Sequence, residues 1–454
     1  MARTLKRSNL HFELALERLP LGVASDRGYW GDDRTFYVKR ASGARLWDID
    51  DNEYIDYRLG GGQAILGYAD SRVSKAARAG ISLGGAFALS TELEFAVAER
   101  IATMVPAAEL VRFSNSEAEA VVDALRLARN FTGRDAIAVV EGRSHGLLGA
   151  VVWEAVGRER PLGAHPAPGS GAVRSSSDRL IYEVPINDID RLDELLRSHG
   201  DQIGAFLIEP IPPHRLSMAA DAAYLAEARA LCDRFGVLLI IDEATTGFRV
   251  AKGGAQEFLG VRADLCTFGP SIASGYPIAA LAGREEIMRR IGAGVVQGGS
   301  QIPHPVSLAV ADKTLEILDR TDALEQIAKF GWRMREGMSQ ALSRRGIPHV
   351  FVGPPSMSML RCGESGSPED PEREKFKAVF CEYLAAHLHE FGILCEADFG
   401  GPWFISTAHN ELCLAETLAK FERAVQGTLE RLPDLPRRTA SGTRQPPSSF
   451  ANPS

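Results

Sequence analysis

The sequence lacks several features that would place a protein in a particular class. No apolar run approaches the about 18 residues that cross a membrane, and residues 1–20 alternate charged and apolar side chains, so no signal peptide is expected. The formal net charge of -8 leaves no basic surface for nucleic acid. The six cysteines include no Cys-x-x-Cys pair, which argues against a metal or redox site. We therefore expect a cytoplasmic protein with reduced thiols and a small-molecule substrate.

Length and composition are those of a large, soluble globular protein. The chain has 454 residues, of which 45% are hydrophobic and 24% charged. Continuous apolar runs at 136–140, 203–208 and 237–241 alternate with segments of helical periodicity such as 91–104. Because buried parallel strands are apolar on both faces, the pattern predicts an α/β protein with a mostly parallel central sheet.

The remaining segments predict a smaller α+β part. Residues 36–57 alternate apolar and polar positions between turn signals, which is typical of short antiparallel strands. Helices are predicted at 324–342 and 372–391. We expect four parts, in chain order: an N-terminal segment 1–75, a large domain 76–315, a small C-terminal domain 316–432 that packs with the N-terminal segment, and a disordered tail 433–454.

Two motifs organise the chain. One is Ile-Asp-Glu-Ala-Thr-Thr-Gly-Phe-Arg at 241–249, and the other is Cys-Thr-Phe-Gly-Pro-Ser-Ile-Ala-Ser-Gly-Tyr-Pro-Ile-Ala-Ala at 266–280. Together they resemble the active-site signature of the class III aminotransferases, in the glutamate-1-semialdehyde 2,1-aminomutase branch. The resemblance spans roughly residues 20–430. It implies the fold-type I architecture of pyridoxal-phosphate-dependent transferases, and a homodimer with the pocket at the subunit interface.

The resemblance also shows where this chain departs from the family. The family lysine that forms the Schiff base with pyridoxal phosphate is replaced by Pro270, which has no amine. The family's Ser-Gly-Thr phosphate cup reads Ser116-Glu117-Ala118 here, and Glu117 would bring a carboxylate towards a phosphate. The aromatic residue that stacks on the cofactor is replaced by Ser144, while Ser300 keeps a hydroxyl where the partner subunit contacts the phosphate. We therefore interpret Ser116, Ser144, Asp242, Pro270 and Ser300 as a vestigial cofactor pocket.

Four residues are candidates for acid–base chemistry. Asp242 follows an apolar strand, at the edge where ligands of α/β sheets bind, and in the family it pairs with the pyridine nitrogen. Glu209 and His145 follow two other strands, and Glu117 opens a helix. A buried His–Asp pair would act as a general base, because the carboxylate orients the imidazole and stabilises its charged form.

Three interpretations remain open at this point. The first is an enzyme that has lost covalent pyridoxal phosphate and catalyses cofactor-independent isomerisation, cyclisation or addition–elimination, with no cofactor expected. The second is an enzyme that binds pyridoxamine 5′-phosphate or pyridoxal 5′-phosphate without a covalent bond. The third is a non-catalytic partner subunit of an active aminotransferase. We favour the first, because His145 and Asp242 are retained.

Overall fold

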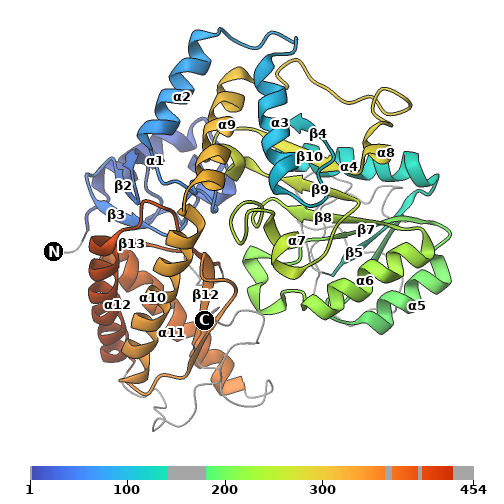
Figure 1. Cartoon of the computed structure of the whole chain (residues 1–454). Coiled ribbons are helices and arrows are strands. Elements are labelled where there is room, and N and C mark those ends of the chain that lie inside the picture. The colour runs from blue at the N-terminus through green and yellow to red at the C-terminus, as the bar shows by residue number, and fades with distance from the viewer. Residues whose placement is uncertain (1–2, 142–144, 146–179, 363–370, 397–400, 433–454) are drawn as a thin grey trace. The chain divides into compact units, whose positions relative to one another are not determined.

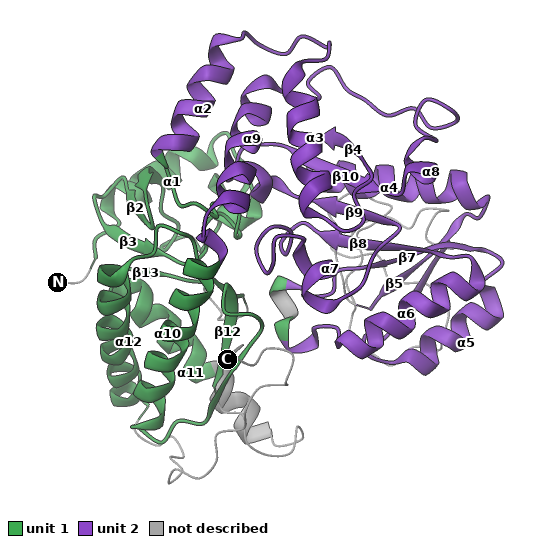
Figure 2. Cartoon of the chain, viewed as in Figure 1, with its two compact units in different colours: residues 1–70, 213–216, 325–454 green, residues 71–212, 217–324 purple. Residues whose placement is uncertain are grey.

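The computed structural model describes residues 3–141, 145, 180–362, 371–396 and 401–432 (Figure 1). The chain divides into two compact units (Figure 2). Unit 1 comprises residues 1–70, 213–216 and 325–454, and unit 2 comprises 71–212 and 217–324. The domain boundaries expected from the sequence stay predictions, and the expected tail at 433–454 lies outside the described residues. Within the described part, no helix has the length and apolarity that crossing a membrane requires.

Unit 2 contains a seven-stranded sheet in the order β4-β10-β9-β8-β7-β5-β6. Strand β10 runs antiparallel to β4 and β9, and the other neighbours are parallel. The predicted α/β fold with a mostly parallel sheet is therefore confirmed. The strands are β4 (Leu110–Ser114), β5 (Ala136–Val140), β6 (Ile181–Val184), β7 (Ile203–Ile208), β8 (Leu238–Glu243), β9 (Leu265–Phe268) and β10 (Ala279–Gly283).

Helices accompany this sheet because their apolar faces pack on its buried strands. Helix α4 buries Val121, Leu125 and Ala128 in one cluster with side chains of β5, β7, β8 and β10. It ends at Gly133, whose left-handed φ of 69° suits glycine. The helices of unit 2 are α2 (Ser71–Ser82), α3 (Glu92–Met104), α4 (Glu117–Thr132), α5 (Ile189–His199), α6 (Ala222–Phe235), α7 (Gly254–Leu259), α8 (Glu285–Met288) and α9 (Pro305–Arg320), with the 3₁₀ turn η6 (Pro270–Ala273).

Unit 1 contains two small sheets, ordered β1-β2-β3-β13 and β11-β12-β14. The strands predicted within 36–57 and the helices predicted at 324–342 and 372–391 are all present. The strands are β1 (Val38–Ser42), β2 (Arg45–Asp48), β3 (Glu53–Asp56), β11 (His349–Val352), β12 (Met357–Cys362), β13 (Ile393–Leu394) and β14 (Trp403–Phe404). The helices are α1 (Lys6–Leu16), α10 (Ala323–Ser343), α11 (Pro371–Glu390) and α12 (Glu411–Arg431), and short 3₁₀ turns lie at η1 (Pro20–Gly22), η2 (Asp26–Gly28) and η5 (Pro213–Met218).

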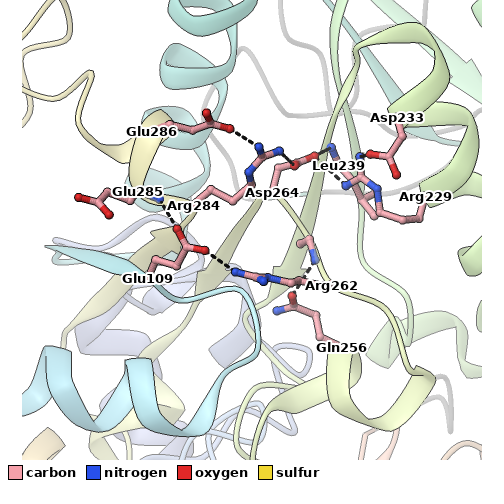
Figure 3. A network of polar contacts seen from close by, with 11 residues as sticks. Glu109, Arg229, Asp233, Leu239, Gln256, Arg262, Asp264, Arg284, Glu285 and Glu286 are labelled. Atoms are coloured by element: carbon pink, nitrogen blue, oxygen red, sulfur yellow. Dashed lines mark hydrogen bonds and ion pairs between the residues drawn. The ribbon is translucent and has the colours of Figure 1, made fainter.

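A polar network joins the starts of β8 and β9 to the end of the antiparallel strand β10 (Figure 3). Its centre is Asp264, which is 4% exposed and directly precedes β9. Its carboxylate accepts hydrogen bonds from Arg229 at 2.7 Å, Arg284 at 2.8 Å and the backbone N–H of Leu239 at 2.8 Å. Because Leu239 lies in β8 and Arg284 directly follows β10, this one side chain holds three strands in register.

Candidate functional site

The site begins with a buried, hydrogen-bonded pair of side chains at the carboxyl end of β8. Asp242 is 5% exposed, and its Oδ2 lies 2.8 Å from Nδ1 of His145, which is 1% exposed. An ionised carboxylate only accepts hydrogen bonds, so Nδ1 is the donor. Nε2 of His145 is buried and has no hydrogen-bond partner among the described residues. The structure thus brings together two of the four predicted acid–base residues, which are 97 positions apart in the chain.

Two further groups hold the other oxygen of Asp242. Oδ1 accepts from the backbone N–H of Ala244 at 3.0 Å and lies 3.3 Å from Oγ1 of Thr267. Thr267 pairs with Asp242 in the parallel register of β8 and β9. The sequence reasoning missed Thr267, although a buried polar residue inside the apolar strand 265–268 was a usable signal.

Glu117, the third predicted residue, is the first residue of α4. Ser116 is the N-cap, and its Oγ accepts from the backbone N–H of Glu119 at 3.3 Å. Glu119 in turn accepts from the backbone N–H groups of Asn115 at 2.7 Å and Ser116 at 3.1 Å. This capping box turns the Glu119 carboxylate back over the helix start. The Glu117 carboxylate instead extends towards the turn after β9, where its Oε2 lies 3.0 Å from the position that a Cβ would take on Gly269.

Pro270 begins η6, directly after Gly269. A proline suits this first position because its ring fixes φ and its missing N–H has no partner to lose. The turn ends at Ser274, which has a left-handed φ of 46°. Ser271 is 3% exposed, and its Oγ has no hydrogen-bond partner among the described residues. A proline is therefore accommodated here as a regular part of the turn.

The other predicted residues are placed as follows. Glu209 is buried directly after β7, the strand that neighbours β8. Ser116 is exposed at the start of α4, and Ser300 is exposed in the turn before α9. Ser144 lies outside the described residues.

Glu243, next to Asp242, points to different partners. It is fully buried, and its carboxylate accepts from the backbone N–H of Ala255 at 2.8 Å and of Gln256 at 3.0 Å, at the start of α7. Burial raises the pKa of Glu243 to about 7, because the charged form is costly away from water. The next buried charge is Arg249, which is 1% exposed, and burial lowers the pKa of its guanidinium to about 10. Successive strand residues face opposite sides of the sheet, so Asp242 contacts His145 while Glu243 anchors α7.

Comparison with known proteins assigns the family. The family model "Aminotransferase class-III" matches residues 29–352. The chain belongs to the class-III aminotransferase family. A glutamate-1-semialdehyde 2,1-aminomutase of Methanothermobacter thermautotrophicus is 36% identical over 420 residues, covering 92% of this chain and 98% of that protein.

Solved structures show the same fold. A structure described as a transaminase with PLP bound matches with a TM-score of 0.85 and 29% identity, covering 95% of this chain and 99% of that one. A glutamate-1-semialdehyde aminomutase of Pseudomonas aeruginosa matches with a TM-score of 0.80 and 23% identity, covering 94% and 95%. The predicted fold-type I architecture is confirmed.

The same comparisons correct one prediction. The expectation that no cofactor is needed is wrong, because the homologues of this chain are pyridoxal-phosphate-dependent aminotransferases and aminomutases, and a structural neighbour has PLP bound. Pro270 has no amine for a covalent bond, but Asp242 is a buried carboxylate of the kind that can pair with a ring nitrogen.

The retained residues fit such a ring. A carboxylate offers about four lone-pair positions, and Asp242 uses three of them, for His145, Ala244 and Thr267. A protonated pyridine nitrogen is a suitable donor for the remaining position. Asp242 and its buried partners are therefore suited to hold the ring, whereas Pro270 offers it no covalent attachment.

Proposed function

We propose that this chain binds pyridoxamine 5′-phosphate or pyridoxal 5′-phosphate without a covalent bond and acts on a small carbonyl compound or amine. The observation that carries the proposal is the buried carboxylate of Asp242, held by His145 at 2.8 Å at the carboxyl end of β8. When bound, the cofactor supplies a protonated ring that accepts electron density from the substrate. Asp242 would keep that ring nitrogen protonated, because an opposite charge at close range favours the charged form.

Non-covalent binding follows from Pro270, which stands where the family carries its lysine. The nearest lysine in sequence is not a good substitute. Lys252, the nearest in sequence, donates to the backbone oxygen of Asp319, and its Nζ lies 3.1 Å from the Asp319 carboxylate with 47% of its side chain exposed. Among the structural neighbours, a lysine-to-alanine variant of the Pseudomonas aeruginosa aminomutase is described in complex with PMP. That protein holds PMP after losing a lysine, which supports the same binding mode here.

Proton transfer would then fall to side chains of this chain other than lysine. Glu117 extends towards Gly269, beside the position of the missing amine. Glu209 follows the strand next to that of Asp242. Together with the His145–Asp242 pair, these carboxylates are the groups we propose as acid and base.

We further propose that the chain works as a homodimer in which Ser300 reaches the pocket of the partner subunit. Ser300 is exposed in the single chain. Apolar side chains are also exposed from the end of α2 to the first turns of α3: Ile81 (64%), Leu83 (55%), Phe87 (42%), Leu89 (77%) and Phe95 (71%). Burial of this surface against a second copy would stabilise the dimer.

The binding proposal is tested by cofactor retention. The protein is incubated with excess pyridoxal 5′-phosphate or pyridoxamine 5′-phosphate, and the bound amount is measured by equilibrium dialysis and by absorbance between about 320 and 430 nm. Borohydride treatment followed by mass spectrometry of the denatured protein then tells covalent from non-covalent binding. We expect the wild type to bind cofactor and keep its mass.

Two variants serve as controls. The triple variant Pro270→Lys, Glu117→Gly, Ala118→Thr restores the family residues, and it should gain the mass of the reduced cofactor. Asp242→Asn removes the charge that pairs with the ring, and it should bind at least about tenfold more weakly. If the wild type bound neither form at millimolar concentration while the triple variant bound both, the proposal would be refuted, and a non-catalytic partner subunit would become the better interpretation.

A further inference from the structure

Glu117 differs from the other acidic residue at the start of α4 in where its carboxylate goes. Glu119 is engaged locally, by the backbone N–H groups of Asn115 and Ser116. Glu117 extends away from the helix, and its Oε2 lies 3.0 Å from the Cβ position of Gly269. The two carboxylates are two residues apart, but only that of Glu117 reaches the turn that leads into η6.

The same turn connects Glu117 to Asp242. The Cβ position of Gly269 also lies 2.9 Å from the backbone oxygen of Ala244, whose N–H donates to Asp242 Oδ1 at 3.0 Å. Glu117 and Asp242 therefore approach one short stretch of backbone from α4 and from β8. A ligand whose ring meets Asp242 and whose other end reaches the start of α4 would bring that end close to the Glu117 carboxylate.

A second feature of this turn is a buried hydroxyl with no partner. Ser271, in η6, is 3% exposed, and its Oγ has no hydrogen-bond partner among the described residues. An unsatisfied buried hydroxyl is costly, and a polar ligand group would relieve that cost. The turn thus combines an uncharged hydrogen-bonding group with a carboxylate.

The charge of Glu117 decides which ligand group suits this end of the pocket. The start of a helix favours an anion, but Glu117 and Glu119 already bring two carboxylates to the first turn of α4. A phosphate dianion placed beside Glu117 is repelled, whereas a hydroxyl is not.

We infer that Glu117 is a specificity-determining residue that weakens the hold of the pocket on a phosphate group, so that pyridoxamine and pyridoxamine 5′-phosphate bind with similar affinity. This inference rests on the proposed function, because it takes Asp242 as the site of the ring. It makes the cofactor of this chain a readily exchanged ligand.

The test compares two ligands that differ only in the phosphate. Dissociation constants for pyridoxamine 5′-phosphate and for pyridoxamine are measured by equilibrium dialysis at pH 8, with the wild type, Glu117→Gln and Glu119→Gln. The ratio of the two constants isolates the contribution of the phosphate. Glu119→Gln is the matched control, since it also removes one negative charge from the first turn and glutamine still completes a capping box.

We expect a ratio within about tenfold of unity for the wild type, and a preference for the phosphorylated ligand that grows by about 10- to 100-fold in Glu117→Gln. Glu119→Gln should change the ratio by less than about threefold, because its carboxylate is turned back onto the backbone N–H groups of Asn115 and Ser116 and not towards Gly269. If circular dichroism shows that Glu117→Gln misfolds, the double variant Glu117→Gly, Ala118→Thr is used instead. It should show the same increase in preference for the phosphorylated ligand.

The outcomes separate the two proposals. Equal ratios in wild type and Glu117→Gln, with both ligands bound, would overturn the inference and leave the proposed function standing. Equal gains in Glu117→Gln and Glu119→Gln would also overturn it, since total charge rather than position would then decide. Failure of all three proteins to bind either ligand would overturn both proposals.

Discussion

Replacing Asp264 by asparagine should destabilise unit 2 more than any other single-charge change in the network of Figure 3. Asp264→Asn keeps the size of the side chain but removes its charge and one acceptor oxygen. Two arginines and one backbone N–H share the native carboxylate. The remaining oxygen cannot accept from all of them, and the new NH₂ group faces a guanidinium.

The magnitude follows from how exposed each partner is. Arg229 is 17% exposed, so weakening its contact with Asp264 costs about 1–3 kcal/mol. The cost is not larger because Arg229 keeps a second carboxylate partner, Asp233. Arg284 is 43% exposed, so its pair contributes at most about 1 kcal/mol. Together these give a loss of about 1–4 kcal/mol in the free energy of unfolding.

Urea denaturation followed by circular dichroism measures this loss. Asp233→Asn is the control, because it removes a carboxylate from the same Arg229 at a side chain that is 65% exposed, and it should cost less than about 1 kcal/mol. If Asp264→Asn were no more destabilising than Asp233→Asn, Asp264 would not be the residue that holds the starts of β8 and β9 and the end of β10 together.

Three further predictions concern other parts of the chain. Burial raises the pKa of Glu243 from an ordinary 4.5 to about 7, so between these pH values the folded state holds a proton that the unfolded state has released. The free energy of unfolding should therefore fall by up to about 3 kcal/mol as the pH rises from 4.5 to 7. Urea titrations at several pH values measure this slope, and Glu243→Gln should flatten it. Gly67 has a φ of 82°, and a Cβ there would lie 2.4 Å from Cβ of Ala408, so Gly67→Ala should lower the free energy of unfolding by about 3 kcal/mol or more. Gly60→Ala is the control: Gly60 has a φ of 66° and no described atom within 4 Å of its Cβ position, so the loss should be only about 1–2 kcal/mol. Equal losses in the two variants would show that the contact with Ala408 is relieved. Phe95 is 71% exposed, so Phe95→Lys should shift the proposed dimer towards monomer in sedimentation velocity. Leu412, on α12, is 62% exposed, and Leu412→Lys should leave the dimer unchanged. A dimer that Phe95→Lys does not affect would place the interface elsewhere.

Local chemistry was enough to predict much of this protein. Continuous apolar runs identify β5, β7 and β8, because a strand buried on both faces has no polar alternation. The capping box at the start of α3 is likewise readable from Thr91 and Glu94. The absence of an amine at Pro270 is a property of the residue and needs no structure.

Tertiary structure decided how the candidate residues combine. His145 meets Asp242 because β5 and β8 are parallel strands of one sheet, separated by β7, and so end at the same edge. Thr267 joins them through the register of β9 on β8. Asp242 and Glu243 are neighbours of like charge in the sequence, and only the pleat of β8 separates their roles. The direction of Glu117 depends on how α4 packs near the turn at Gly269, and no local pattern encodes a contact between side chains so far apart in the chain.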